Sequence, residues 1–359
     1  MRIILKLVNS LFILIKQADV MLVFTEESII YMSRMKRAFF ICMLCMAFVI
    51  CGCNTEPTQK DDKITIVCTN FPLYDWTRQI LGENDAEVIL LLDNGTDMHS
   101  FQPSAEELIQ IADCDMLVHV GGESDAWLMD ALNANPNEER VVVNLMEVLE
   151  DDLKEEVYTE GMQAEHTHED GSVCDVDHDE VAMDEHVWLS LKLAVKSCEA
   201  VEDALCKVLP ESEASIRSNA DVYCNELLAL EQEYENLATE EVILVADRFP
   251  FMYLTDDLGL KYYAAFPGCS TESEADFETV VFLAEKVKEY EVDTILITES
   301  GTDTLANTVY ENAGTEDGSI AVLHSMQVVY NSDIENGCTY LAYMEENLKV
   351  LEQVLGCSQ

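Results

Sequence analysis

The chain has 359 residues and carries 70 Asp and Glu against 20 Lys and Arg, a formal net charge of −50. This charge repels nucleic-acid phosphates and concentrates cations near the molecule, which argues against a nucleic-acid partner and favours a metal ion or cationic ligand. Apolar residues make up 49% of the chain, with 7 Pro and 14 Gly, so a disordered acidic polymer is excluded and the length suits about two domains.

A secretory signal peptide is predicted at residues 35–52. Lys36 and Arg37 precede an apolar run over 38–50. That run is shorter than the about 20 apolar residues that a membrane-spanning helix needs, so it is better interpreted as a leader that is removed after export.

The end of this leader resembles the bacterial lipobox, because the small residue Gly52 precedes Cys53. Cys53 is therefore expected to become the lipidated first residue, and residues 53–62 form a polar tether. A signal peptide is read at an amino terminus, so translation is expected to start at Met35. Residues 1–34 would then be an upstream extension that results from a wrongly assigned start codon. The alternative is that they form a genuine amphipathic segment.

Short apolar runs alternate with helical patterns along the rest of the chain. Strand, helix, strand order predicts parallel α/β sheets. The expected strands form one group within 63–209 and another within 241–359, so we predict an α/β fold of two lobes, each with a parallel sheet flanked by helices. The expected strands are 63–69, 86–93, 116–120 and 140–145, then 242–247, a run near 260–266, 293–298 and 320–324.

One long helix is predicted to link the lobes over residues 210–240. Pro210 and Glu211 suit its first turn. Some 28 residues from Pro210 would extend about 40 Å, enough to run along both lobes. The apolar positions recur at spacings of four and three, as on one face of a helix. They are Ile216, Ala220, Tyr223, Leu227, Leu230, Tyr234 and Leu237.

Residues 147–185 interrupt this pattern with sixteen acidic residues and Lys154 as the only basic one. Too few large apolar side chains are present to offset the entropy of ordering them, so a loop is expected. His166, His168 and His178 within it could capture a metal ion weakly and pass it inward, or act as a sensor of that metal. They could equally be incidental residues of a solvated loop.

Three other histidines, His99, His186 and His324, fall at predicted strand ends or junction loops. In α/β sheets ligands bind outside the carboxyl ends of strands. Neutral imidazoles with carboxylates nearby suit a zinc-type ion better than calcium or magnesium, which prefer oxygen ligands. Each histidine taken alone, however, is more often a hydrogen-bonded structural residue, so spacing leaves both interpretations open.

Other reactive-looking segments are weaker. No CxxC pair follows the leader, which leaves a zinc knuckle or redox motif unsupported. The run Gly268-Cys269-Ser270 could suggest a nucleophile, but no positioned base accompanies it, so a turn is favoured.

Four sequence motifs follow one another between residues 63 and 355. They are FPLY at 71–74, GTDMHSFQPS at 95–104, ADCD at 112–115 and DEHVWL at 184–189. Together they resemble the solute-binding proteins of zinc and manganese ABC importers, the cluster 9 or A-I family, whose patterns include G-x-D-P-H-S-[YF]-x-P-[ST] and D-P-H-x-W-L. The acidic loop and the long helix also occur where that family has them.

The resemblance implies a two-lobed binder with a rigid linking helix, which holds a metal between the lobes. His99 and His186 would be the ligands of the first lobe. The protein would be exported and lipid-anchored on the outer face of the cytoplasmic membrane or in the periplasm. It would act as a monomer that delivers its metal to an ABC permease and would not be an enzyme.

The second lobe departs from the family pattern. Where relatives place His or Glu before a helix that begins F-x-Y-[FL], this chain has Asp247 and Arg248. Asp247 is the candidate ligand, although it could instead pair with Arg248 or cap the helix. His324 stands where several relatives carry Asp and is the expected third ligand. Glu299 falls at a family carboxylate and would orient an imidazole or neutralise Arg248.

Three imidazoles and at most one carboxylate favour Zn²⁺, with Mn²⁺ as the alternative, because a manganese site is richer in oxygen. Two other functions remain open. An exported zinc-dependent hydrolase would need an open coordination position and could use Glu299 as a base, although no HExxH motif is present. A surface adhesin of the same fold is the second.

Overall fold

The computed structural model describes residues 63–163, 182–237, 241–270, 274–315 and 317–356. The predicted leader and tether with Cys53, and the loop histidines His166, His168 and His178, lie outside these described residues.

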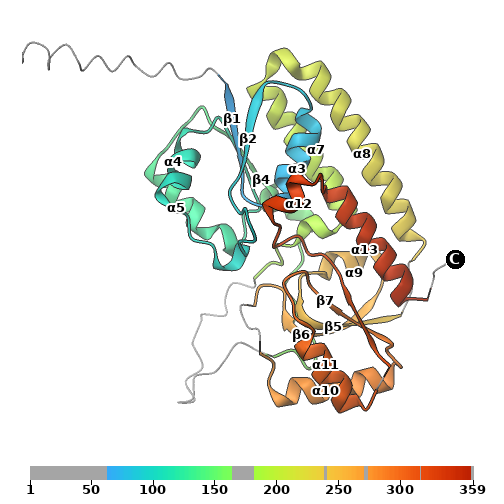
Figure 1. Ribbon diagram of the computed structural model, residues 1–359. Coiled ribbons are helices and arrows are strands. Elements are labelled where there is room, and N and C mark those ends of the chain that lie inside the picture. Colours follow the sequence, from blue (N-terminus) through green and yellow to red (C-terminus); the bar gives the residue numbers. More distant parts are fainter. Residues whose placement is uncertain (1–62, 164–181, 238–240, 271–273, 316, 357–359) are drawn as a thin grey trace, which may run out of the picture. The chain divides into compact units, whose positions relative to one another are not determined.

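The first sheet has the strand order β2-β1-β3-β4, and all its pairs are parallel. Helices cover it (Figure 1). Local signals set their starts: the Asn70 side chain accepts from Leu73 N, and Ser104 forms a capping box with Glu107. The elements are β1 (Ile64–Cys68), α3 (Phe71–Leu81), β2 (Ala86–Leu90), α4 (Ala105–Asp113), β3 (Met116–His119), α5 (Ala126–Ala134), β4 (Val141–Asn144) and α6 (Leu145–Val148).

The second sheet has the order β6-β5-β7-β8, again all parallel. Counted from its own first strand, this order is the same as in the first sheet. The predicted α/β class, with two parallel sheets joined by a long helix, is confirmed. The elements are β5 (Val242–Phe249), α9 (Met252–Leu258), β6 (Lys261–Pro267), α10 (Phe277–Glu289), β7 (Thr294–Ile297), α11 (Asp303–Ala313) and β8 (Ser319–Val322).

Two antiparallel helices, α7 (Leu191–Val208) and α8 (Glu213–Glu235), lie beside the first sheet in Figure 1, and α8 continues to α9 of the second half. At 1.5 Å per residue, α8 is about 35 Å long. Its buried residues are the ones predicted from the spacing of four and three. They are Ile216, Ala220, Tyr223, Leu227, Leu230 and Tyr234.

The segment after β8 returns the chain to the first half, where Gly95 N donates to Val329 O at 2.9 Å, and the last helix, α13 (Tyr340–Val354), follows α12 (Asn331–Glu335) and begins beside α3. Tyr340 N donates to Asp75 Oδ2 at 2.9 Å, and its ring packs edge-on against Trp76 of α3. Tyr234 OH of α8 donates to Met344 O at 2.6 Å. These contacts join α3, α8 and α13 in one core.

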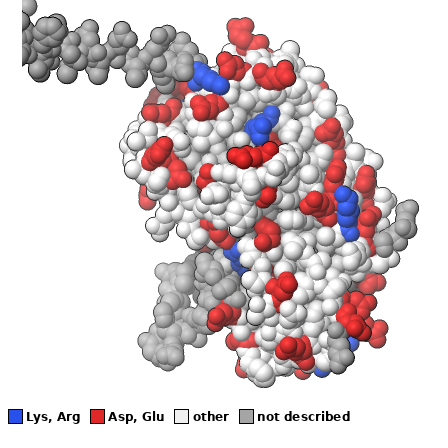
Figure 2. All heavy atoms as spheres, viewed as in Figure 1, with Lys and Arg blue, Asp and Glu red and all other residues white. Residues whose placement is uncertain are grey.

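The described surface is strongly acidic. In Figure 2, Asp and Glu are spread over the visible face while Lys and Arg are few. None of the helices in the described ranges is long and apolar enough to cross a membrane.

Two neighbouring leucines test the packing of α8. Leu227 is fully buried and Leu228 is 39% exposed. Leu227→Ala should lower the free energy of unfolding by about 2–5 kcal/mol through lost burial and a residual cavity. Leu228→Ala, the matched control, should change it by about 0.5 kcal/mol or less. Urea denaturation of both variants measures this, and equal losses would contradict the assigned helix face.

Candidate metal centre

His99 lies in a short 3₁₀ turn, Met98–Ser100, in the loop after β2. Asp97 caps that turn by accepting from His99 N at 2.9 Å. The His99 ring is fixed at both nitrogens: Nδ1 lies 3.1 Å from Ser124 Oγ, and Nε2 lies 3.0 Å from Gln327 Nε2.

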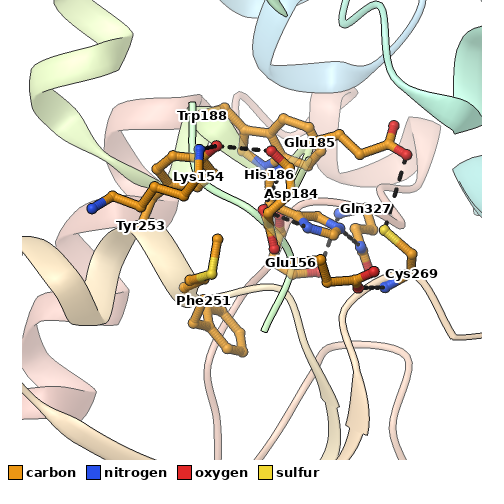
Figure 3. A network of polar contacts seen from close by, with 12 residues as sticks. Lys154, Glu156, Asp184, Glu185, His186, Trp188, Phe251, Tyr253, Cys269 and Gln327 are labelled. Atoms are coloured by element: carbon orange, nitrogen blue, oxygen red, sulfur yellow. Dashed lines mark hydrogen bonds and ion pairs between the residues drawn. The ribbon is translucent and has the colours of Figure 1, made fainter. Parts of the chain in front are cut away.

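His186 is fully buried and immediately precedes the 3₁₀ turn Val187–Leu189. Its backbone N donates to Asp184 Oδ1 at 2.9 Å, and its Nδ1 lies 3.2 Å from the same oxygen. Its Nε2 also contacts Gln327 Nε2. The ring centroids of His99 and His186 are 5.6 Å apart. The structure therefore brings these two predicted ligands together. Figure 3 shows His186 with Gln327 and the neighbouring carboxylates.

Gln327 reaches this point from the loop after β8, on the second sheet. Glu299, which follows β7, holds that loop by accepting from Ser325 N at 2.7 Å, Ser325 Oγ at 2.8 Å and Val328 N at 3.1 Å. Trp188 Nε1 donates to Ser325 O at 2.9 Å and ties the loop to the His186 segment. Glu299 thus contacts the backbone that carries Gln327 and contacts neither histidine in the described hydrogen bonds.

Cys269 comes from the loop after β6. Its N donates to Glu156 Oε1 at 3.5 Å, and its thiol contacts Glu185 Oε1 at 3.9 Å. The preceding Gly268 lies against His186, where an added Cβ would be 2.9 Å from the ring. A side chain at this position would displace the imidazole, so glycine permits the close approach of the two loops.

Buried carboxylates surround these groups. Glu185 is 1% exposed and Asp184 is 2% exposed. Burial raises the pKa of Glu185, and burial together with the charge of Asp184 raises the pKa of Glu156. Among the described ion pairs, none joins Asp184, Glu185 or Glu156 to a lysine or arginine. The site therefore has excess negative charge, which a bound cation would offset.

The two imidazoles differ in electrostatics. Burial, then the neighbouring His186, lower the pKa of His99 to about 3, and Arg248 adds to this. Burial would also lower the pKa of His186, but Asp184 first, then Glu185 and Glu156, outweigh it and raise that pKa. The carboxylates that favour a proton on His186 also favour a metal cation beside it, because the proton and the metal ion both carry positive charge.

The hydrogen bonds fit one tautomer of each neutral ring. With its proton on Nδ1, His186 donates to Asp184 and His99 donates to Ser124. Each Nε2 then has a lone pair that can accept from the Gln327 amide. Two oriented Nε2 lone pairs directed at one point are what a metal ion requires of imidazole ligands.

The structure does not bring His324 to these histidines. β8 ends at Val322, and the His324 ring instead lies 4.8 Å from the Tyr343 ring, with Nε2 at 3.7 Å from Glu346 Oε2. Backbone bonds to Asn347 hold the residue there, with His324 N to Oδ1 at 2.7 Å and Nδ2 to His324 O at 2.8 Å. His324 thus faces α13.

Asp247 is also directed elsewhere. Its Oδ2 accepts from Thr298 N at 3.0 Å and Thr298 Oγ1 at 2.6 Å. It lines a cavity of about 260 Å³ together with Arg248. The Arg248 guanidinium pairs with Asp97 Oδ2 at 2.8 Å and so links β5 to the His99 turn.

Two side chains at the centre were missed from sequence. Gln327 is not an ionisable ligand, and Cys269 sits in a segment interpreted as a turn. A positional signal was available, because both residues follow the carboxyl ends of parallel strands, Cys269 after β6 and Gln327 after β8.

Comparison with known proteins agrees with this architecture. Residues 66–354 match the family described as ZnuA, zinc-uptake complex component A, periplasmic. The zinc-binding lipoprotein AdcA of Streptococcus pneumoniae serotype 4 is 31% identical over 323 residues, which cover 89% of this chain and 60% of AdcA. The high-affinity zinc uptake system protein ZnuA of Bacillus subtilis is 25% identical over 323 residues, with 88% and 96% covered.

Among solved structures, the Zn(II)-bound ZnuA-like domain of S. pneumoniae AdcA superimposes with a TM-score of 0.63 at 27% identity, covering 82% of this chain and 99% of that domain. The chain spans only 60% of the length of the AdcA relative. The resemblance first recognised in the four sequence motifs is confirmed, and the chain belongs to the ZnuA family of zinc-uptake components.

Proposed function

We propose that this protein is the extracytoplasmic solute-binding component of an ABC importer, which captures Zn²⁺ between its two lobes and delivers it to a permease. One observation supports this most directly: the Nε2 atoms of His99 and His186 meet at a single amide, that of Gln327. The buried carboxylates around them supply the negative charge that a dication needs.

The names of the relatives support the same cargo, since the AdcA and ZnuA relatives are described as zinc-binding and zinc-uptake proteins. A hydrolase is less well supported. Glu299, its possible base, already accepts three hydrogen bonds from the loop 325–328, which leaves it poorly placed to activate water.

Export and anchoring belong to the same proposal. The leader at 35–52 would direct export, and lipidation of Cys53 would hold the protein at the membrane surface, where a permease can receive the metal. The predicted monomer suits delivery of one ion at a time.

Substitution of the histidines tests the site. His99→Ala and His186→Ala should each weaken Zn²⁺ binding by more than about 100-fold, because changes even to residues that only support a ligand cost about 10- to 100-fold. Competition with a chromophoric chelator measures the dissociation constant. His324→Ala is the control and should bind nearly as native, since this ring packs on α13.

A large loss of affinity in His324→Ala would restore His324 as the third ligand and require the lobes to rearrange when the metal binds.

In cells, a strain lacking this gene should need more zinc for growth. Native protein, but not the His99 or His186 variants, should restore growth at low zinc.

Metal preference tests the choice of ion. The nitrogen-rich centre should bind Zn²⁺ more tightly than Mn²⁺, because imidazole suits zinc and manganese prefers oxygen ligands. Calorimetric titration of metal-free protein with each ion gives both constants. Tighter Mn²⁺ binding would overturn the assignment of zinc as cargo.

The loop histidines are proposed to capture zinc weakly and pass it to the central site. Replacing His166, His168 and His178 together by Ala should remove weak binding and leave one tight ion per chain, because these residues are separate from His99 and His186 in the sequence. Equilibrium dialysis measures the stoichiometry. Unchanged weak binding would show that the loop histidines are incidental.

A further inference from the structure

The thiol of Cys269 belongs to the same group of potential ligands as the two imidazoles. One atom from each of His99, His186 and Cys269 lies within 4.8 Å of the others. In a tetrahedral zinc site with Zn–N of about 2.0–2.1 Å and Zn–S of about 2.3 Å, ligand atoms lie about 3.3–3.7 Å apart. Shifts of about 1 Å would therefore place all three on one ion.

We propose that Cys269 is a metal ligand, contributed by the second lobe to the site that His99 and His186 begin. This inference rests on the proposed function and deepens it by naming a sulfur donor. The thiol is carried at the carboxyl end of β6, and Gly268 allows that loop to lie directly against the His186 ring.

Gln327 provides an independent indication that a ligand belongs at this point. Its side chain is 4% exposed, its amide nitrogen contacts both Nε2 atoms, and its Oε1 has no hydrogen-bond partner among the described groups. A buried amide oxygen without a partner is costly. Rotation of the amide by half a turn exchanges the two atoms, and Oε1 would then face a bound ion as a fourth donor.

The surroundings of the thiol keep it protonated until an ion binds, because burial and then the charges of Glu185 and Glu156 raise the pKa of Cys269. Glu185 Oε1 is 3.9 Å from Sγ and is the acceptor for the S–H proton in the ion-free protein. When zinc binds, the S–H bond breaks and an S–Zn bond forms, while the proton passes by way of Glu185 to water. The thiolate and nearby carboxylates then balance the charge of the dication.

A sulfur donor also sets selectivity. Thiolate is a soft ligand that favours zinc and disfavours manganese, so Cys269 would act as a specificity-determining residue. Loss of the thiol should therefore reduce Zn²⁺ affinity more than Mn²⁺ affinity.

Cobalt substitution tests the inference in the full chain, purified in mild detergent. Thiolate ligands give Co²⁺ a sulfur-to-metal charge-transfer band in the near ultraviolet, which nitrogen and oxygen ligands do not. The native protein should show this band, and Cys269→Ser should lose it and bind Zn²⁺ about 100-fold more weakly. Cys206→Ser on α7 is the matched control and should retain both the band and the affinity.

Two results would overturn the inference. The first is Co²⁺ binding that depends on His99 but lacks the charge-transfer band, which leaves the proposed function intact. The second is absence of any His99-dependent binding of Co²⁺ or Zn²⁺, which would overturn the proposed function as well. Cys269→Ala provides a second variant, and its circular dichroism spectrum and unfolding midpoint identify a folding defect.

Discussion

The centre of the molecule depends on a contact between its two halves: the Gln327 amide, from the second sheet, meets the Nε2 atoms of two histidines carried by the first half. A hydrogen bond at Nδ1 orients each imidazole, with Asp184 for His186 and with Ser124 for His99. The loop that carries the amide is oriented in turn by Glu299. Hydrogen bonds from several loops thus set the geometry of the proposed ligands, as is typical of metal sites.

Charge accompanies this geometry. The buried Asp184 and Glu185 and the partly buried Glu156 bring negative charge to the site, whereas Arg248 is paired with Asp97, which precedes His99 in the same loop. The Asp97 carboxylate therefore partly neutralises the positive charge that Arg248 would otherwise exert on the imidazoles. The paired Arg248 side chain therefore lies near His99, and its charge does not cancel the negative potential around His186.

The fold was largely predictable from sequence, and the site only in part. The eight strand segments and the apolar face of α8 follow from local periodicity, which is a property of neighbouring residues. His99 and His186 could be proposed as ligands because motifs surround them, and the structure brings the two rings together. The direction of His324 could not, because it depends on bonds to Asn347 and on the Tyr343 ring, which lie in a later helix. Cys269 and Gln327 likewise reach the centre only through long-range packing.

The return of the chain to the first half after β8 has a mechanical consequence. The polypeptide passes between the two lobes more than once, since α8 leads from the first to the second and the segment after β8 comes back, so that Tyr340 at the start of α13 bonds Asp75 and packs on Trp76. Any hinge opening must therefore flex several connections together, which restricts it to small rotations. A proteolytic cut within α8 alone would leave the halves attached through the carboxyl-terminal helix.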